Sequence, residues 1–400
     1  MRILIAGSTY APALNGQAIF TVNLAEGLAK RGHQVLCAFP SPKPLSEVRN
    51  LVQLEQIRSF SMAAVHEDSY VPLFQGPAIH RIFNTFRPEI VHIQDHYPIG
   101  RSAAIEAHKR RIKIVATNHF MPENLAPYLP LYPVLKSFYT WSLWRWMLEV
   151  YQRADVATAQ SRVAAELIRK QGLQIPVLPA SCGIDLGRFH PDPATDRSAC
   201  RRRYGIDTEK TIFLFVGRVD REKRIDVLLR AVSMLRRDDI QLVIAGHGAA
   251  SNEFQSLAAT LGLGARVRFT GFIPNEDLHV LLNSVNIFCM ASEAELLSIA
   301  SLEAMACALP VLMADAVALP ELVTPGVNGF LFHPGDPGDA AAHMERLANS
   351  RELWSEMGQA SLKRASYHSL ENTLTRYEKL YTQVLAGGSL TDFSSDAIAP

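Results

Sequence analysis

The chain has 400 residues, with 40 lysines and arginines against 39 aspartates and glutamates. This length exceeds what one ordinary hydrophobic core supports, so it predicts two domains of roughly 150–200 residues. A hydrophobic content of 48% and a charged content of 20% exclude a disordered, collagen-like or coiled-coil protein. The net charge of +1 argues against nucleic acid as the main partner.

The sequence has no uninterrupted apolar run of about 18 residues, so it predicts no membrane-spanning helix. Its opening, Met1–Ala6, is too short and too strand-like for a signal peptide. The five cysteines are far apart and form no Cys-x-x-Cys pair, so neither a zinc site nor a disulfide framework is expected. We therefore expect a protein of the reducing cytoplasm.

The first half of the chain alternates short apolar runs with longer amphipathic stretches. Continuously apolar runs are typical of buried parallel strands. A helix is expected over Gln17–Arg31, because its alanines and Val22 recur at helical spacing and Gly32 follows. The expected strands are Arg2–Ala6, Gln34–Ala38, Ile90–Gln94, Ile114–Asn118, Val156–Gln160 and Ile175–Pro179.

The same alternation restarts after about residue 190. Two successive β-α-β series predict an α/β fold of two doubly wound, Rossmann-like parallel sheets, each covered by helices on both faces. The expected strands are Thr211–Gly217, Gln241–Gly246, Arg266–Gly271, Asn286–Ala291 and Pro310–Ala314. The expected helices are Ile225–Arg236, Asn252–Leu261, Asn275–Asn283 and Ile299–Cys307.

The polar, proline-containing segment Asp185–Thr195 is the expected domain boundary. We expect a first domain over residues 1–190 and a second over residues 191–365. A long helical pattern covers Ser361–Leu385, and residues 366–386 are expected to form a C-terminal helix that packs back toward the first domain. Residues 387–400 are small and polar, which predicts a flexible tail.

The segment Tyr128–Tyr151 is rich in aromatic residues and holds three of the four tryptophans. One interpretation is a helix that packs its aromatic residues into the core. The other is an interfacial helix, with aromatic rings at the level of lipid headgroups and Lys136 and Arg145 toward anionic lipid. The sequence leaves both interpretations open.

The strongest chemical signal is Val216–Arg224, where a predicted strand ends at Gly217 and a basic loop follows. Ligands of open parallel sheets bind beyond the carboxyl ends of the strands. Arg218, as a bidentate fork, and Lys223, as a point charge, suit a diphosphate at that position. A solvated basic loop without a ligand is the alternative.

A second signal is the pair Glu295 and Glu303, eight positions apart around the expected start of a helix. Ser298 is expected to cap that helix, which leaves backbone N–H groups directed at an anion. The two carboxylates are suited to accept hydrogen bonds from sugar or ribose hydroxyls. The alternative is a helix whose acidic flanks are stabilised by its dipole.

Weaker signals lie in the first half. The glycine-bearing turn Gly7–Gln17 follows the first strand, but it is not the G-x-G-x-x-G fingerprint of dinucleotide-binding proteins. Polar clusters also end two predicted strands, at His92–Pro98 and Thr117–Phe120. These clusters are expected to face the same cleft as Arg218 and Glu295, although a lone histidine is more often structural.

These residues, taken in order, resemble a known family, the retaining nucleotide-sugar glycosyltransferases of GT-B fold and specifically family 4. The resemblance covers nearly the whole chain and is carried by an ordered set of motifs. They are Gly32-His33-Gln34-Val35, Gly183-Ile184-Asp185, Val216-Gly217-Arg218 with Lys223, Thr270–Pro274, and Glu295 through Glu303 with Ala304-Met305-Ala306 and Pro310-Val311.

The resemblance implies roles in donor binding for the second domain. Arg218 and Lys223 would bind the donor diphosphate, Glu295 would contact hydroxyls of the donor sugar, and Glu303 would contact the ribose. The backbone of Leu297, Ser298 and Ile299 would meet sugar and phosphate.

In the first domain, His119 stands where relatives place a histidine near the donor sugar, and Gly16 stands where a glycine loop faces the diphosphate. His119, Arg218, Lys223 and Glu295 are accordingly the expected catalytic residues. The chain departs from the family pattern where Asn15 precedes Gly16, where Leu297-Ser298 replaces Phe-Gly, and where Ala308 replaces the glycine after Cys307.

The resemblance further implies a first domain that binds the acceptor and a second that binds the nucleotide sugar, facing a central cleft. The expected reaction is metal-independent, retaining front-side transfer of a hexose from a UDP-sugar to a hydroxyl. The run His119–Asn124 with the aromatic helix resembles lipid-modifying members. It points to a glycerolipid acceptor such as diacylglycerol and a peripheral position at the inner face of the cell membrane. A soluble or polysaccharide acceptor, a catalytically silent nucleotide-sugar-binding partner subunit and a nucleotide-sugar epimerase are the alternatives.

Overall fold

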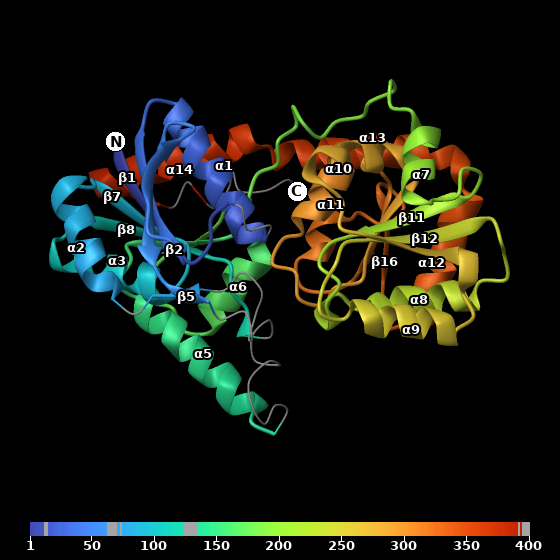
Figure 1. Cartoon of the computed structure of the whole chain (residues 1–400), viewed down its shortest axis with the longest axis horizontal. Coiled ribbons are helices and arrows are strands. Elements are labelled where there is room, and N and C mark those ends of the chain that lie inside the picture. Colours follow the sequence, from blue (N-terminus) through green and yellow to red (C-terminus); the bar gives the residue numbers. More distant parts are fainter. Residues whose placement is uncertain (12–14, 62–69, 73, 123–133, 391–392, 394–400) are drawn as a thin grey trace. The chain divides into compact units, whose positions relative to one another are not determined.

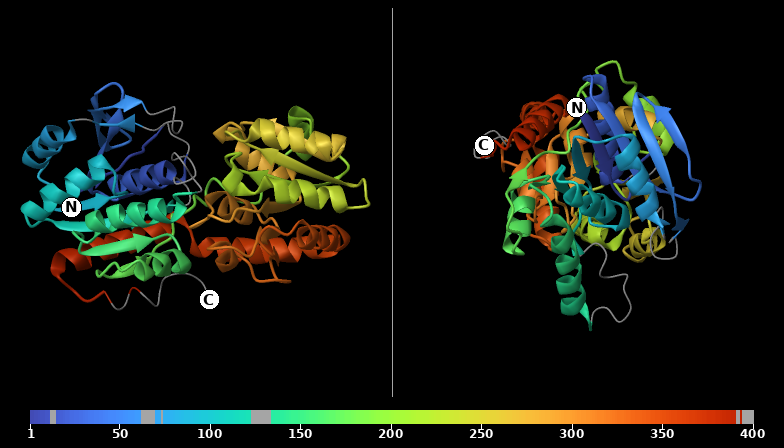
Figure 2. Two further views of the ribbon diagram at one scale, coloured as in Figure 1. Left: turned by 90° about the horizontal axis from the view of Figure 1, so that it is seen from below. Right: turned by 90° about the vertical axis from the view of Figure 1, so that its left-hand side faces the viewer.

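The computed structural model describes residues 1–11, 15–61, 70–72, 74–122, 134–390 and 393. The chain divides into two compact units (Figures 1 and 2). Unit 1 comprises Met1–Gly183 and Leu370–Ile398, and unit 2 comprises Ile184–Ser369. The chain first passes from unit 1 to unit 2 between Gly183 and Ile184, just before Asp185–Thr195, where the domain boundary was expected.

Unit 1 is built on an eight-stranded sheet in the order β10-β9-β8-β7-β1-β2-β4-β3. Its central strands are entirely buried apart from their ends, as their continuous apolar runs predict. The strands are β1 (Arg2–Ala6), β2 (Gln34–Ser41), β3 (Ser46–Arg49), β4 (Val52–Arg58), β7 (Ile90–Ile93), β8 (Lys113–Asn118), β9 (Val156–Ala159) and β10 (Val177–Pro179). A separate two-stranded sheet pairs β5 (Phe60–Ser61) with β6 (Tyr70–Val71).

The predicted parallel sheet of unit 1 carries one antiparallel pair at its edge, where β3 pairs with β4. The two strands are joined by Asn50 and Leu51, which both have left-handed backbone angles, with φ of 49° and 69°. A two-residue turn of this kind joins only antiparallel neighbours. The charged residues of the hairpin hid both strands from the sequence pattern.

The helices of unit 1 lie on both faces of its sheet (Figure 1). Helices α1 and α14 contact each other on one face, and α2 and α3 contact each other on the opposite face. Asn15 caps α1 by accepting a hydrogen bond from the Ala18 N–H at 2.9 Å. The helices are α1 (Gly16–Lys30), α2 (Gln75–Thr85), α3 (Pro98–Lys109), α5 (Lys136–Tyr151), α6 (Arg162–Lys170) and α14 (Leu370–Ala386).

Unit 2 contains a six-stranded parallel sheet in the order β13-β12-β11-β14-β15-β16. Helices α8, α9 and α12 cover one face, and α10, α11 and α13 cover the other (Figure 1). The strands are β11 (Thr211–Val216), β12 (Ile240–Ala245), β13 (Val267–Gly271), β14 (Ile287–Met290), β15 (Val311–Ala314) and β16 (Gly329–Phe332). The helices are α7 (Arg197–Tyr204), α8 (Ile225–Met234), α9 (Ser251–Thr260), α10 (Asn275–Ser284), α11 (Ile299–Ala306), α12 (Pro337–Asn349) and α13 (Trp354–Tyr367), with short 3₁₀ turns at Arg221–Lys223, Gly264–Arg266, Leu319–Leu322 and Arg351–Leu353.

The long final helical pattern, expected as one stretch over Ser361–Leu385, is two helices. Helix α13 ends at Tyr367 in unit 2, and α14 begins at Leu370 in unit 1. The break is held open by a tertiary contact, since the Ile184 N–H donates to the His368 carbonyl at 2.9 Å. Such a contact overrides a local helical pattern and leaves no periodic signal.

Helix α11 ends in a strained Schellman motif. The Ala308 N–H donates to the Met305 carbonyl at 3.0 Å, and the Leu309 N–H donates to the Ala304 carbonyl at 3.1 Å. Ala308 therefore adopts the left-handed conformation, with φ of 56°. Glycine takes this conformation without strain, whereas a Cβ atom makes it costly.

We expect Ala308→Gly to stabilise unit 2. Relief of left-handed strain is worth roughly 1–2 kcal/mol, and the added freedom of the unfolded chain removes roughly 0.4–1 kcal/mol of that gain. Thermal unfolding should show a higher midpoint. As a control, Ala360→Gly inside α13 should lower the midpoint, because glycine in a helix costs about 1 kcal/mol. A lower midpoint for Ala308→Gly would contradict the assignment of strain.

Candidate functional site

The loops that follow β11 and β12 pack backbone against backbone. Gly217 has a φ of +155° and Gly246 a φ of +143°, and a Cβ atom on Gly246 would lie 1.8 Å from the Gly217 carbonyl oxygen. The Val219 N–H then donates to the His247 carbonyl at 3.1 Å. These contacts fix the path of the basic loop just beyond the carboxyl end of the sheet, where ligands of such sheets bind.

The basic loop is held by carboxylates. Arg218 pairs with Asp220 at 2.5 Å and with Glu222 at 2.9 Å, and the same Oε1 atom of Glu222 lies 3.5 Å from Lys223 Nζ. Lys223 also pairs with Glu295 at 2.7 Å. The structure thus brings Arg218, Lys223 and Glu295 into one ion-pair network, with Glu222 as a bridge that the sequence analysis missed.

Lys223 is cationic at neutral pH. Burial lowers the pKa of Lys223, but the negative charges of Glu295 and Glu222 outweigh burial and bring this pKa above its ordinary value. Burying a charged amine is costly unless it is paired, so these carboxylates keep the cation in place. Two cations, Arg218 and Lys223, are thus fixed in place by the carboxylates of one ion-pair network.

Ser298 caps α11, as predicted. Its Oγ accepts hydrogen bonds from the Ser301 N–H at 3.2 Å and from the Ser301 hydroxyl at 2.7 Å. The side chains of Leu297 and Ser298 are buried, whereas Ile299 at the first turn is half-buried. The positive end of α11 therefore begins only three residues beyond Glu295.

Glu303 lies further along α11 and does not join the ion-pair cluster. Burial raises the pKa of its carboxyl to about 7, and the charge of Arg188 opposes that shift. Within the described part of the chain, its carboxylate has no hydrogen-bond or ion-pair partner. Glu303 is therefore an acceptor whose charge changes near neutral pH.

Of the site residues predicted in the first half, His119 follows β8 in unit 1. Its Nδ1 lies 2.5 Å from Gln160 Nε2, and its Nε2 lies 2.9 Å from Gln94 Oε1. Burial lowers the pKa of His119 to about 3, so the imidazole is neutral. The two glutamines were missed, because an amide at a strand end carries no sequence signature.

The opening loop of unit 1 is anchored by Asp95. Its carboxylate accepts hydrogen bonds from the Ser8 N–H at 2.6 Å, from Gln17 Nε2 at 2.7 Å and from the Tyr97 N–H at 3.0 Å. Burial raises the pKa of Asp95 and these hydrogen bonds oppose the shift. Gly16 lies exposed in the first turn of α1. Pro12–Leu14 of this loop, and Glu123 and Asn124 of the predicted acceptor run, are outside the described residues.

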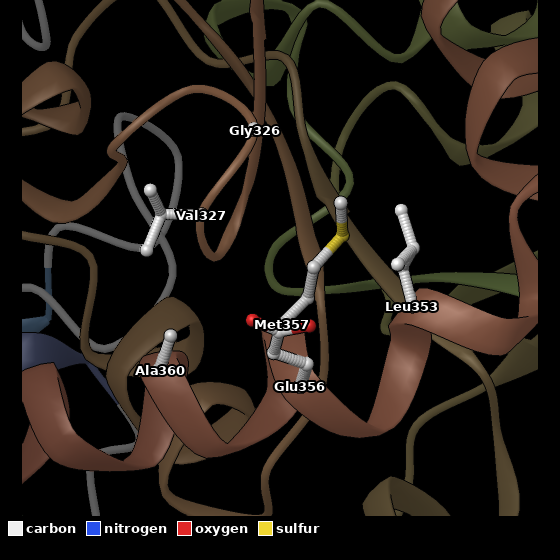
Figure 3. Close-up of a pocket in the computed structure, with 6 residues that line it drawn as sticks. All are labelled: Gly326, Val327, Leu353, Glu356, Met357 and Ala360. Atoms are coloured by element: carbon white, nitrogen blue, oxygen red, sulfur yellow. The ribbon is translucent and has the colours of Figure 1, made fainter.

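A separate cavity of about 160 Å³ lies in unit 2 between α13 and the loop before β16 (Figure 3). None of its lining residues is among the predicted site residues. They are Gly326, Val327, Leu353, Glu356, Met357 and Ala360. In the described part of the chain, no helix is long and apolar enough to cross a bilayer. The same residues include no group of three histidines, cysteines or acids placed to hold a metal ion.

Two sequence-family models match the chain one after the other. The family described as glycosyltransferase family 4 matches residues 14–188, and that described as glycosyl transferases group 1 matches residues 196–364. The chain belongs to the family 4 glycosyltransferases. It is a hexosyltransferase of GT-B fold that uses a nucleotide-sugar donor.

Relatives along the whole chain agree with this membership. A GDP-mannose-dependent alpha-mannosyltransferase of Corynebacterium glutamicum is 26% identical over 96% of this chain and 90% of its own. Among solved structures, the sucrose-phosphate synthase of Thermosynechococcus elongatus aligns over 97% of this chain and 99% of its own, with a TM-score of 0.78 and 19% identity. Anabaena HepE in complex with UDP-glucose aligns over 96% and 100%, with a TM-score of 0.76 and 17% identity.

For this glycosyltransferase we expect Arg218→Ala to lower kcat by a factor on the order of 10²–10³, the usual cost of losing one preorganised group that stabilises developing charge. Steady-state assays with a saturating donor measure the effect. Arg221→Ala is the matched control, because Arg221 belongs to the same loop but has a side chain that is 82% exposed and pairs with Glu253. Equal rates for the two variants would refute the role of Arg218.

We also expect the stability of the glycosyltransferase to depend on pH through Glu303. The folded-state pKa of about 7 exceeds the ordinary value of 4.5, so the protonated carboxyl favours the folded state. That contribution is complete below pH 4.5 and is lost as the pH rises through 7.

Glu303→Gln removes this titration. The melting temperature of the wild type should therefore fall relative to that of Glu303→Gln between pH 4.5 and pH 7. The exposed Glu352→Gln serves as control. Parallel melting curves for wild type and Glu303→Gln across this range would contradict the prediction.

Proposed function

We propose that this glycosyltransferase moves a hexose from a nucleotide sugar to a hydroxyl acceptor with retention of anomeric configuration, by front-side displacement. The observation that supports the proposal is the cluster of Arg218, Glu222, Lys223 and Glu295. Two cations that share one carboxylate oxygen, beside the start of α11, form a preorganised cradle for a leaving diphosphate. Unit 2 is accordingly the proposed donor-binding domain and unit 1 the proposed acceptor-binding domain.

In the proposed step, the bond between the anomeric carbon and the diphosphate oxygen breaks while the acceptor oxygen attacks from the same face. The acceptor proton goes to an oxygen of the departing phosphate. Glu295 is a poor candidate for a covalent nucleophile, because Lys223 neutralises it at 2.7 Å. Glu295 instead accepts hydrogen bonds from the donor sugar, and His119 contacts the same sugar as a neutral group.

We assign the remaining contacts with the nucleotide sugar to residues outside the basic loop. The carboxylate oxygens of Glu303 are proposed to accept hydrogen bonds from the ribose hydroxyls. The backbone of Leu297, Ser298 and Ile299 meets sugar and phosphate at the start of α11, and Gly16 meets the diphosphate from the first turn of α1. The positive charge of Arg218 and Lys223 serves where a metal ion would otherwise neutralise the diphosphate, so we propose that transfer needs no metal.

The proposed donor is a UDP-sugar, the expectation drawn from the sequence. GDP-mannose is the second candidate, because the corynebacterial relative that spans the chain is named for that donor. The test is a panel of UDP- and GDP-sugars scored by thermal stabilisation, followed by release of the nucleoside diphosphate with a hydroxyl acceptor. A bound donor in large excess over its Kd raises stability by a few kcal/mol.

Proton NMR of the product decides the stereochemistry, and an assay in EDTA decides the need for metal. We expect retention and an unchanged rate in EDTA. Inversion, or loss of the rate in EDTA with recovery on adding Mg²⁺ or Mn²⁺, would overturn the mechanism. If the donor binds but no acceptor leads to release of the nucleoside diphosphate, the result would favour a catalytically silent partner subunit instead.

A glycerolipid such as diacylglycerol is the proposed acceptor, with the enzyme at the membrane surface. Helix α5 projects from the body of unit 1 (Figures 1 and 2). Its first half exposes Phe138 by 58% and Trp141 by 62%, and Val134 just before it by 86%. The exposed Lys136 and Arg145 lie on the same helix. Exposed aromatic rings beside basic side chains favour the headgroup region of an anionic bilayer.

The second half of α5 packs inward, because Leu143, Trp144 and Met147 are buried. The two interpretations of this segment thus apply to different parts of one helix, a core half and an exposed half. The residues of the segment up to and including Pro133, among them Tyr128 and Tyr132, are outside the described residues.

We expect flotation with vesicles containing phosphatidylglycerol to recover less of the double variant Phe138→Ala/Trp141→Ala than of the wild type. Each large side chain lost from a membrane interface removes roughly 1.5–3 kcal/mol of burial. Met234→Ala, which removes a side chain that is 58% exposed on α8 of unit 2, is the control. Equal recovery of all three proteins would exclude α5 as the membrane contact.

A further inference from the structure

Three neighbouring strands of unit 1 carry polar side chains in two parallel rows. Each strand contributes one polar residue near its end and a second two positions later, so both point to the same face of the sheet. The first member of each pair lies in the strand and the second directly follows it: His92 and Gln94 for β7, Thr117 and His119 for β8, and Thr158 and Gln160 for β9.

The inner row consists of His92, Thr117 and Thr158, and it is hydrogen-bonded to the C-terminal helix α14. His92 lies 2.7 Å from the Tyr381 hydroxyl and 2.6 Å from the Thr117 hydroxyl, and Thr117 lies 2.6 Å from the Thr158 hydroxyl. The Tyr377 hydroxyl completes the row, 3.1 Å from Thr158. All five side chains are buried. A buried polar network that is satisfied in this way fixes one arrangement of its elements, here of α14 across three strand ends.

The outer row consists of Gln94, His119 and Gln160. Its two amides lie on either side of the His119 ring. Gln160 Nε2 is a nitrogen that can only donate, so the His119 Nδ1 that faces it accepts. With the two amides in these orientations, a neutral ring carries its proton on Nε2 and donates it to Gln94 Oε1. The Phe20 ring covers the imidazole at 5.0 Å between centroids.

Each of the two amides has one polar atom that is not used in the contact with His119. Gln94 Nε2 and Gln160 Oε1 are buried and lack a hydrogen-bond partner among the described residues. Buried polar groups without partners cost folding free energy, and their presence calls for a functional explanation. Apolar residues at these two positions would remove that cost, but they would leave the ring of His119 unconstrained.

We propose that Gln94 and Gln160 are positioning residues that hold His119 as the neutral Nε2–H tautomer, with the inner row and α14 keeping the three strand ends in register. The inference rests on the proposed role of His119 beside the donor sugar. Positive charge develops at the anomeric carbon as the diphosphate departs. An imidazolium nearby would oppose that charge, whereas a neutral ring held between two amides does not.

Within the described residues, the hydrogen-bond partners of the His119 ring are two amides and include no carboxylate. Burial, with the nearby His119, lowers the pKa of His92 to about 3, so that imidazole is neutral as well. Amides on both sides of the ring therefore set its tautomer without adding a charge, which a carboxylate in either place would do.

The experiment compares Gln160→Glu with Gln94→Glu in protein labelled with ¹⁵N-histidine, with His119→Gln used to assign the signals. A carboxylate opposite Nδ1 accepts where the amide donated, so Gln160→Glu should place a proton on Nδ1. A carboxylate opposite Nε2 accepts as the amide oxygen did, so Gln94→Glu should keep the Nε2–H tautomer. Gln152→Glu, at the exposed residue that directly follows α5, is the control for added charge.

In kinetics, Gln160→Glu should lower kcat by about tenfold or more, with a smaller change in the KM for donor. A wild-type protein with the proton on Nδ1 would overturn the proposal. So would a Gln160→Glu protein with unchanged histidine signals and unchanged kcat. If Gln160→Glu fails to fold, Gln160→Leu removes the donor without a charge, and His119 should then populate both tautomers. The NMR experiment reports the tautomer of His119 whether or not the protein has the proposed transfer activity. A failure of the tautomer proposal can therefore be distinguished from a failure of the proposed function.

Discussion

The shared carboxylate of Glu222 is the interaction on which the rest of the proposed chemistry depends. Two cations in one loop repel each other, and Lys223 is buried, so neither would stay in place without compensation. Glu222 meets both, and Glu295 takes up the remaining charge of Lys223. The cradle is thus organised before a ligand arrives, and little reorganisation is needed when charge develops on a leaving group. The close packing of Gly217 against Gly246 fixes the loop that carries it.

The fold was predictable wherever burial made a strand or helix uniform in its pattern. Buried strands such as β1 and β12 need apolar residues on both faces, and their runs in the sequence carry that demand directly. Predictions failed where a local turn or a distant contact decided the structure. The β3–β4 hairpin depends on left-handed residues that are not glycine, at Asn50 and Leu51. The division between α13 and α14 depends on a hydrogen bond to His368 from Ile184, far away in the sequence.

The site divides in the same way. Arg218, Lys223 and Glu295 could be found because charged residues after a buried strand are unusual and their spacing matches a family motif. Their mutual contacts could not be found, since Glu222 looks like any surface acid until the loop is folded. Gln94 and Gln160 gave no signal, because neutral amides occur at many strand ends. Their meaning comes from the parallel register of β7, β8 and β9, which places them on either side of His119.

Transfer from a sugar diphosphate makes two electrostatic demands of opposite kind. The leaving group gains negative charge and calls for fixed cations, and the anomeric carbon gains positive charge and calls for their absence. In the proposed mechanism, unit 2 meets the first demand with charged side chains held by carboxylates. The outer row of unit 1 has the form that suits the second, because a histidine held between amides is polar, oriented and uncharged. A lysine in place of that histidine would bring a charge, and a leucine would bring no hydrogen bond. An imidazole held between two amides is oriented by neutral partners and adds no charge, and this arrangement accounts for two partly unsatisfied amides in the interior.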